Sequence, residues 1–240
     1  MRKYLFFILL TLAAFTEASA ESLYDEFLGI YDAYASDDKT FYALQKLNEY
    51  DSNGKLVSET DADCLIYGNN EMTRINKKGQ DLYFLSTASG YWIKNDKLQQ
   101  PLKISGSYKV MEIQMQDLLR IDFRNDFCID NGDAESGNTI LLKRTNRKNT
   151  YSYIRLNKKS GQYRAEMLDA KKQKLKTLIY ETGEINGITC FSSVSITDDV
   201  FSTGAYYKYI TVSMKSIKVS KVLFNPVFMD ELIRFFEKKS

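Results

Sequence analysis

Residues 41–67, FYALQKLNEYDSNGKLVSETDADCLIY, have the pattern of two β-strands joined by a tight turn. The runs 41–51 and 55–67 flank Ser52-Asn53-Gly54. Asn-Gly readily adopts the left-handed backbone of a short hairpin turn, so the two runs are predicted to pair as antiparallel strands. This hairpin indicates a sheet built with short connections.

Further strand-like runs follow this hairpin, separated mostly by short polar turns. They cover residues 72–77, 82–87, 91–94, 102–105, 139–145, 151–157, 163–169, 175–181, 188–196 and 207–219. Connections of this length join neighbouring antiparallel strands, which predicts a meander. Along residues 207–214, apolar side chains alternate with Tyr, Thr and Ser. Both faces of that strand are therefore predicted to be covered or partly covered.

Three segments have helical spacing instead. Ser22 and Asp25 fit a capping box. The apolar residues after it share one helical face: Leu23, Phe27, Ile30, Tyr31 and Tyr34. The spacing of Met and Leu residues predicts a short amphipathic helix over residues 110–121. Asn225-Pro226 fits the N-cap and first position of a final helix.

These elements predict one domain over residues 21–240, of mainly β (α+β) class. We expect a single large curved antiparallel sheet of about ten strands, a half-barrel closed by short helices. The chain contains only 2 prolines, which suits long continuous strands.

Residues 1–20 have the pattern of a cleaved secretory signal peptide. Arg2 and Lys3 precede an apolar run, and Ala18-Ser19-Ala20 forms a small-residue cleavage site. The next residue is Glu21 and not a cysteine that could carry lipid. After it, no apolar run approaches the length of a membrane span. We therefore expect a soluble protein that lies outside the cytoplasm, with no stable membrane insertion.

The composition argues against several classes of function. With 33 basic and 31 acidic residues, the formal net charge is +2, which does not suggest a nucleic-acid partner. The chain has no histidine, which excludes Ser-His-Asp and Cys-His catalysis and argues against a zinc or iron site. Carboxylate-based and lysine-based catalysis do not need histidine, so the composition does not exclude them. We expect neither a cofactor nor enzymatic activity.

Paired carboxylates are the remaining candidates for catalysis: Asp61 with Asp63, Asp122 with Asp126, and Asp198 with Asp199. General acid–base catalysis needs two such groups facing one cleft, and we interpret these pairs as solvated turns and strand edges. Lysine pairs at 77–78, 158–159 and 171–172 could meet an acidic partner or anionic lipid. We interpret them as solubilising the tips of hairpins.

The three cysteines, Cys64, Cys128 and Cys190, are widely spaced, and no CxxC motif is present. Their spacing is compatible with one disulfide plus one buried thiol, or with three buried thiols in strands.

Aromatic and methionine side chains are candidates to line an apolar cavity. The candidate residues are Phe84, Tyr91, Trp92, Met111, Met115, Leu118 and Leu119. Methionine suits a cavity that accepts varied apolar ligands, because its side chain is flexible and polarisable. Ordinary core packing is the alternative for all seven.

Three stretches resemble motifs of known proteins. The first is YWIK at 91–94, followed by PLKISGS at 101–107. The second is MQDL at 115–118 with RIDFRNDF at 120–127, and the third is YRAEMLD with LKTL across residues 163–178. In these motifs the chain resembles the LolA/LolB-like periplasmic lipoprotein carriers, and most closely the LolA-like outer membrane lipoprotein-sorting proteins.

The resemblance implies a non-enzymatic carrier that holds the acyl chains of lipoproteins or lipids inside a half-barrel. It implies an inner-membrane exporter and an outer-membrane acceptor as partners, and residues 110–121 as the lid. Burial of each methylene contributes about 0.8 kcal/mol, so no charged site is needed to hold an acyl chain. The alternatives are a protein-interaction module with a fully packed interior and a carboxylate-based hydrolase.

Overall fold

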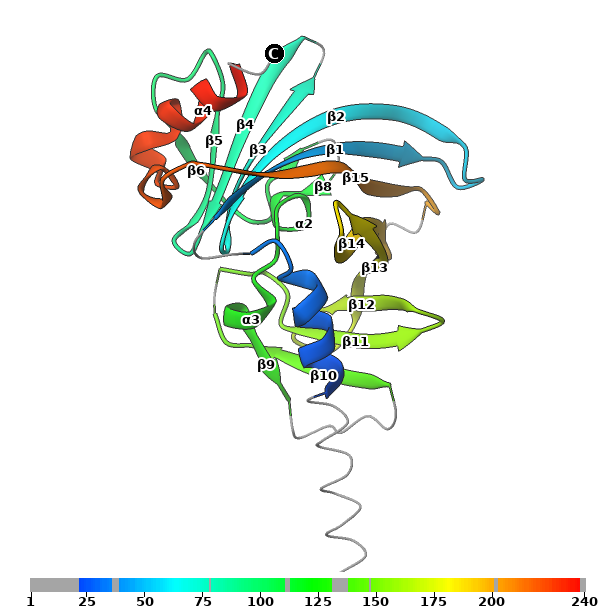
Figure 1. Ribbon diagram of the computed structural model, residues 1–240. Coiled ribbons are helices and arrows are strands. Elements are labelled where there is room, and N and C mark those ends of the chain that lie inside the picture. Colours follow the sequence, from blue (N-terminus) through cyan, green and yellow to red (C-terminus); the bar gives the residue numbers. More distant parts are fainter. Residues whose placement is uncertain are drawn as a thin grey trace, which may run out of the picture.

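The computed structural model describes residues 22–35, 39–77, 79–110, 113–130, 138–146, 148–200 and 203–237. The predicted signal peptide, residues 1–20, lies outside them. In the described part, 13 strands form one antiparallel sheet (Figure 1). The strands are β1 (Thr40–Tyr50), β2 (Leu56–Tyr67), β3 (Asn70–Lys77), β4 (Gln80–Thr87), β5 (Gly90–Lys94), β6 (Leu102–Ile104), β9 (Phe127–Ile129), β10 (Thr139–Arg144), β11 (Tyr153–Lys159), β12 (Gln162–Leu168), β13 (Lys174–Ile185), β14 (Ile188–Asp198) and β15 (Tyr206–Ile217). This confirms the predicted fold class, a large curved sheet with flanking helices.

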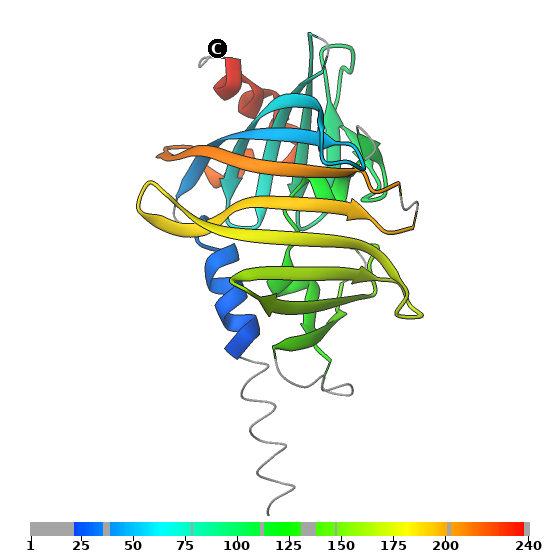
Figure 2. The same ribbon diagram turned by 90° about the vertical axis from the view of Figure 1, so that its right-hand side faces the viewer.

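The first and last strands of the sheet pair in its middle. The strand order is β6-β5-β4-β3-β2-β1-β15-β14-β13-β12-β11-β10-β9, and Figure 2 shows β15 between β1 and β14. The chain therefore runs outward from β1 to the edge strand β6, crosses to the opposite edge at β9, and returns strand by strand. With β6 and β9 at its two edges, the curved sheet is open.

The crossing segment, residues 105–126, connects the two edges. It contains the two-stranded ribbon β7 (Lys109–Val110) and β8 (Ile113–Gln114), and the one-turn helices α2 (Met115–Leu118) and α3 (Phe123–Asp126). Its apolar side chains pack in the same core as strands from both halves of the sheet. The segment therefore covers the concave face.

The concave face carries the main core. The N-terminal helix (residues 22–31) packs there beside the crossing segment (Figure 1). Phe27 is fully buried at its centre. Five aromatic rings lie with their centroids 4.9 to 5.5 Å from that of Phe27: Tyr31, Phe123, Tyr163, Tyr180 and Phe191. The helical face predicted from the sequence is the face that meets the sheet.

The C-terminal elements cover the convex face of β1–β5. They are η1 (Lys221–Leu223), η2 (Pro226–Phe228) and α4 (Met229–Glu237), which lies against this half of the sheet in Figure 1. Leu232 and Phe236 of α4 share a core cluster with Tyr83 and Trp92. The Asn225 side chain accepts a hydrogen bond from the Val227 N–H at 3.0 Å, which confirms the predicted start of the final helical segment.

The hairpin that opens the sheet is also confirmed. β1 pairs with β2 in antiparallel register, and Gly54 in the turn has φ 76°. The predicted helix over residues 110–121 is wrong in extent, because among the described residues of this range only Met115–Leu118 is helical and β8 precedes it. An extended chain rises about 3.3 Å per residue against 1.5 Å in a helix, so the non-helical residues on either side of this turn lengthen the reach of the segment across the sheet.

All three cysteines are free thiols, with Cys64 and Cys190 buried and Cys128 exposed. Neither predicted arrangement, one disulfide or three buried thiols, is observed. Phe127 and Ile129 of β9 point into the core, so the alternation along the strand turns Cys128 outward. Within the described residues, no helix combines the length and the apolar character needed to cross a membrane.

Candidate functional site

A cavity of about 140 Å³ lies on the concave face, between the sheet, the crossing segment and the N-terminal helix. Six strands from both halves of the sheet contribute to its wall: β1, β2, β3, β13, β14 and β15. Its apolar lining includes Ile30, Ile66, Leu118, Leu119, Leu178 and Val194. The cavity exists because the crossing segment spans the curved sheet without filling all the space beneath it.

The predicted cavity residues of the crossing segment are only partly at this site. Leu118 and Leu119 line the cavity. Met115 is fully buried in the concave core outside the lining. Met111 lies outside the described residues. A ligand-binding role for these four side chains stays a prediction.

The predicted aromatic residues divide between the two faces of the sheet. Phe84 and Tyr91 are buried in the concave core, outside the cavity lining. Trp92 points to the convex face and packs in the cluster beneath α4. Successive residues of a strand point to opposite faces, so Tyr91 and Trp92 cannot line one cavity on one face. A role for these three residues in binding also stays a prediction.

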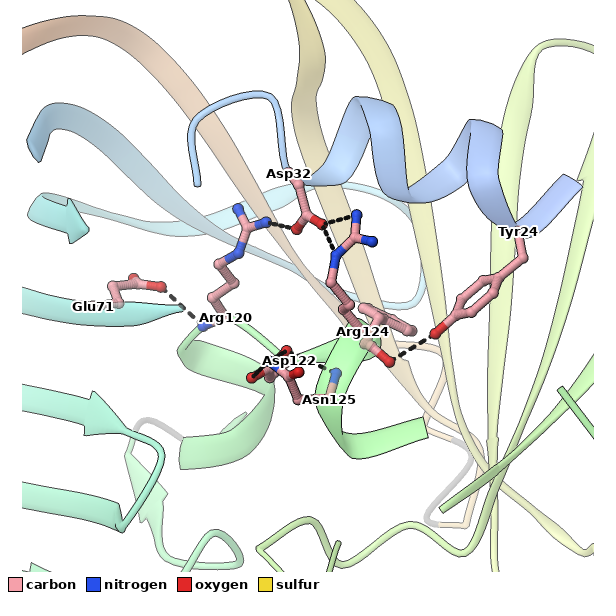
Figure 3. Close-up of polar contacts among 8 residues, drawn as sticks. Tyr24, Asp32, Glu71, Arg120, Asp122, Arg124 and Asn125 are labelled. Carbon is pink, nitrogen blue, oxygen red and sulfur yellow. Dashed lines mark hydrogen bonds and ion pairs between the residues drawn. The ribbon is translucent and has the colours of Figure 1, made fainter. Parts of the chain in front are cut away.

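Polar contacts attach the crossing segment to the end of the N-terminal helix (Figure 3). The Asp32 carboxylate pairs with the Arg120 guanidinium on one side and with Arg124 on the other, where Nη2 lies 2.9 Å from Oδ2. The Arg120 guanidinium also lies 4.2 Å from the ring centroid of Tyr31. Tyr24 Oη donates to the Phe123 carbonyl at 2.7 Å. The helix and the crossing segment thus form one cover over the cavity.

A row of polar groups, buried on β3 and β2 and half-buried on β1, crosses these strands at the cavity floor. Glu71 accepts hydrogen bonds from the Arg120 N–H at 2.9 Å and from Thr73 Oγ1 at 2.7 Å. Cys64 Sγ lies 3.3 Å from Thr73 Oγ1 and donates to Gln45 Oε1 at 3.1 Å. Burial raises the pKa of Glu71, because the low-dielectric surroundings disfavour the charged form.

A buried ion pair attaches α2 to β13 on the other side of the cavity. Lys176 Nζ pairs with Asp117 Oδ2, and both side chains are almost completely removed from solvent. Tyr151 Oη donates to Asp117 Oδ1 at 2.6 Å. Burial raises the pKa of Asp117, while Lys176 acts in the opposite direction.

None of the polar groups Glu71, Asp117, Lys176, Arg120 and Tyr209 was among the predicted cavity residues. They come from distant parts of the chain, and only the crossing segment and the curvature of the sheet bring them together. One feature of the sequence could have indicated a polar residue on the concave face: alternation along β3 places Glu71 on the same face as Ile75.

The predicted carboxylate pairs do not form a common cleft. On the convex face, Asp63 pairs with Arg74 and accepts a hydrogen bond from Tyr42 Oη at 3.0 Å. Asp122 caps α3 by accepting from the Asn125 N–H at 3.1 Å. Asp199 accepts from Thr177 Oγ1 at 2.6 Å. Asp63 and Asp126 are buried. Our interpretation of the carboxylate pairs as solvated was therefore wrong for these two residues.

The carboxyl group of Asp126, on α3, is expected to make stability depend on pH. Burial raises its pKa to about 6, with Lys148 opposing and Asp122 adding to the shift. The folded state therefore binds this proton more tightly than the unfolded chain, in which the pKa of an Asp side chain is about 3.9. The contribution of Asp126 to stability is complete below about pH 4 and is lost as the pH rises through about 6.

Replacing Asp126 with Asn should remove this contribution. Denaturant unfolding between pH 4 and 7 should show a smaller fall in stability with rising pH for Asp126→Asn than for the wild type. An exposed acid on a turn, Asp96, provides the matched variant Asp96→Asn, which should keep the wild-type slope. Equal slopes for all three proteins would show that Asp126 titrates normally.

No family model and no curated protein matches this sequence. Solved structures do match it over most of its length. A LolA superfamily protein from Nitrosomonas europaea superposes with a TM-score of 0.69 at 19% identity, covering 87% of this chain and 98% of that one. A domain described as an outer membrane lipoprotein-sorting protein, from Vibrio parahaemolyticus, has a TM-score of 0.61 at 15% identity, covering 88% and 97%.

A DUF1329 family protein from Desulfovibrio piger also matches, with a TM-score of 0.58 at 15% identity, covering 86% of this chain and 97% of that one. These likenesses span nearly the whole of each known structure. The chain therefore has a LolA-like fold, as the resemblance in its motifs implied.

Proposed function

We propose that the chain is a non-enzymatic periplasmic carrier that binds an acyl chain of a lipoprotein or lipid in the concave cavity. The cavity carries the proposal, because it is a space with a mainly apolar wall in the face that the crossing segment covers. The predicted signal peptide supports the periplasmic location. The LolA-like fold supports the carrier role, since one of the similar structures is described as a lipoprotein-sorting domain.

The cavity is small for a complete acyl chain. Its volume of about 140 Å³ is close to that of an engineered cavity of about 150 Å³ that binds benzene. Each buried methylene contributes about 0.8 kcal/mol, so a longer chain supplies free energy to displace part of the cover. Binding of a full acyl chain is therefore coupled to opening.

Opening should begin on the side of the N-terminal helix. The Asp32–Arg124 contact is partly solvated, with 57% of the Arg124 side chain exposed, and exposed ion pairs contribute only about 0–1 kcal/mol. The Asp117–Lys176 pair is buried, and separating it is far more costly. The carrier then keeps α2 attached to β13, while movement of the helix end also separates the Asp32–Arg120 pair.

The proposed partners follow from the carrier role. Acyl chains of a lipoprotein or lipid are the cargo, an inner-membrane exporter delivers them, and an outer-membrane acceptor receives them. The cavity favours this role over an interaction module, which requires a fully packed interior. Hydrolysis is disfavoured because both cavity carboxylates are already engaged, Glu71 by Thr73 and Arg120, and Asp117 by Lys176 and Tyr151.

The test is to fill the cavity. Val194 lines it, and Val194→Phe places a ring in the space that the acyl chain would occupy. Binding of the fluorescent apolar dye N-phenyl-1-naphthylamine, and its displacement by methyl octanoate, should weaken at least tenfold, or about 1.4 kcal/mol. Val212, which is 55% exposed on β15, provides the control Val212→Phe, which should bind as the wild type does.

Two outcomes would contradict the proposal. If the wild-type protein binds neither the dye nor the ester, the chain is not an acyl carrier. If Val194→Phe remains folded and binds both ligands as tightly as the wild type, binding takes place away from the concave cavity.

A further inference from the structure

Tyr209 combines two features: its side chain lines the cavity, and its hydroxyl has no hydrogen-bond partner among the described residues, a property that it shares with Tyr163, which lies outside the lining. Tyr209 lies on β15 and pairs with Leu47 of β1 and Val194 of β14, and its hydroxyl is buried. By contrast, the hydroxyl of Tyr151 donates to Asp117, and that of Tyr24 donates to a backbone carbonyl.

An unpaired buried hydroxyl is unfavourable for the folded protein alone. Burying a polar group without a partner has a substantial free-energy cost, and most buried polar atoms in folded proteins are paired. Phenylalanine would fill the same space on β15 without this cost. A hydroxyl in the wall of a binding cavity is therefore best explained by a partner that arrives with the ligand.

The surrounding charges define that partner. Burial, with Asp117 and Glu71 adding to its effect, raises the pKa of Tyr209, so its hydroxyl stays protonated and acts as a donor. Arg120, the cationic residue of the described lining, is already paired with Asp32, and Lys176, which lies outside the lining, is paired with the lining residue Asp117. Within the described lining, no cation is free to compensate a carboxylate or phosphate, which favours a neutral hydrogen-bond acceptor.

We propose that the Tyr209 hydroxyl is the polar anchor of the cavity and donates a hydrogen bond to the carbonyl oxygen of an acyl ester or amide. The hydrocarbon chain then lies against the apolar wall. This inference rests on the proposed acyl-carrier function and specifies its ligand class: acyl chains linked through a neutral carbonyl are preferred to free fatty acids. Both lipidated peptides and glycerolipids carry such groups.

The experiment compares Tyr209→Phe with Tyr207→Phe. Tyr207 lies two positions away on the same strand, is outside the cavity lining, and its hydroxyl lies 3.4 Å from Glu49. Three ligands are used: N-phenyl-1-naphthylamine, which lacks a carbonyl, and methyl octanoate and octanoate as its competitors. Thermal unfolding of each variant shows whether it remains folded.

Tyr209→Phe should weaken methyl octanoate binding by about 3- to 10-fold, as expected for loss of one neutral hydrogen bond. Its affinity for the dye should stay within about twofold of the wild type, and its Tm should be equal or higher, because no partner within the protein is lost. Tyr207→Phe should bind all three ligands as the wild type does. The wild type should bind the ester more tightly than octanoate.

The outcomes separate this inference from the proposed function. If the wild type and Tyr209→Phe bind methyl octanoate equally while both bind the dye, Tyr209 is not the anchor and the carrier proposal still stands. Absence of binding by the wild type overturns both. A short diacylated cysteinyl peptide and dioctanoylglycerol then distinguish the two ligand sources. The ligand that binds Tyr209→Phe more weakly than the wild type represents the source that Tyr209 recognises. If Tyr209→Phe binds both ligands as tightly as the wild type does, the anchor is overturned as well.

Discussion

Replacing Lys176 with Met should lower the free energy of unfolding by about 3–5 kcal/mol, because it leaves the Asp117 carboxylate buried without its counter-ion. The Asp117 side chain is 0% exposed and that of Lys176 is 6% exposed. Among the described residues, Asp117 then keeps only its hydrogen bond from Tyr151 Oη. Urea denaturation at pH 7 measures the loss.

The neighbouring Lys174 provides a matched control on the same strand. Its Nζ lies 3.0 Å from Asp199, but its side chain is 38% exposed. Lys174→Met should therefore cost no more than about 1 kcal/mol. Combining Lys176→Met with Asp117→Asn should recover at least half of the lost stability, because the buried charge is then removed. Equal losses for the two lysine variants would show that the Asp117–Lys176 pair is not effectively buried.

Replacing Phe27 with Ala should be about as damaging, with an expected loss of about 3–5 kcal/mol. Phe27 is 0% exposed and contacts five aromatic rings, so its removal leaves a cavity among side chains that are held from several elements. The docking surface of the N-terminal helix is lost with it. The same denaturation experiment measures the effect.

Tyr108→Ala is the corresponding aromatic control, because Tyr108 is 45% exposed. Its effect should stay within about 0.5 kcal/mol, as for surface substitutions in general. A loss below about 1 kcal/mol for Phe27→Ala would mean that the N-terminal helix contributes little to the core.

Local features of the sequence predicted most of the strands and their turns. The Asn53-Gly54 turn, the alternation along β15 and the Asn225-Pro226 helix start are decided by a few neighbouring residues. Each depends on backbone preferences or on the two-residue period of a strand, which act over short distances. Other stretches, at residues 91–107, 115–127 and 163–178, carried the resemblance to a LolA-like fold, which the structure confirms.

The path of the chain between β6 and β9 could not be predicted in this way. The Met and Leu spacing of residues 110–121 suits a helix, but in the described part of this range the helix is limited to Met115–Leu118, and non-helical residues beside it extend its reach across the sheet. The sequence also did not reveal that β1 and β15 pair, because 155 residues lie between the end of β1 and the start of β15. Pairing at that separation depends on the whole sheet.

The candidate site was predicted least well. Leu118 and Leu119 lie in the cavity wall, but Trp92 packs under α4 on the opposite face. Aromatic character predicts burial without indicating which face of the sheet a residue meets. The polar groups of the cavity, such as Glu71 and Tyr209, have no distinctive local pattern, because each is an ordinary strand residue until the crossing segment covers it.

The sequence by itself determined the fold class, the strand pattern, the apolar face of the N-terminal helix and the absence of histidine chemistry. These properties depend on composition and on the spacing of neighbouring residues. Only the tertiary structure decided where the cavity lies, that Asp117 and Lys176 meet, and that the Tyr209 hydroxyl is left without a partner among the described residues. Those properties depend on contacts between segments that only the curvature of the sheet and the crossing segment bring together.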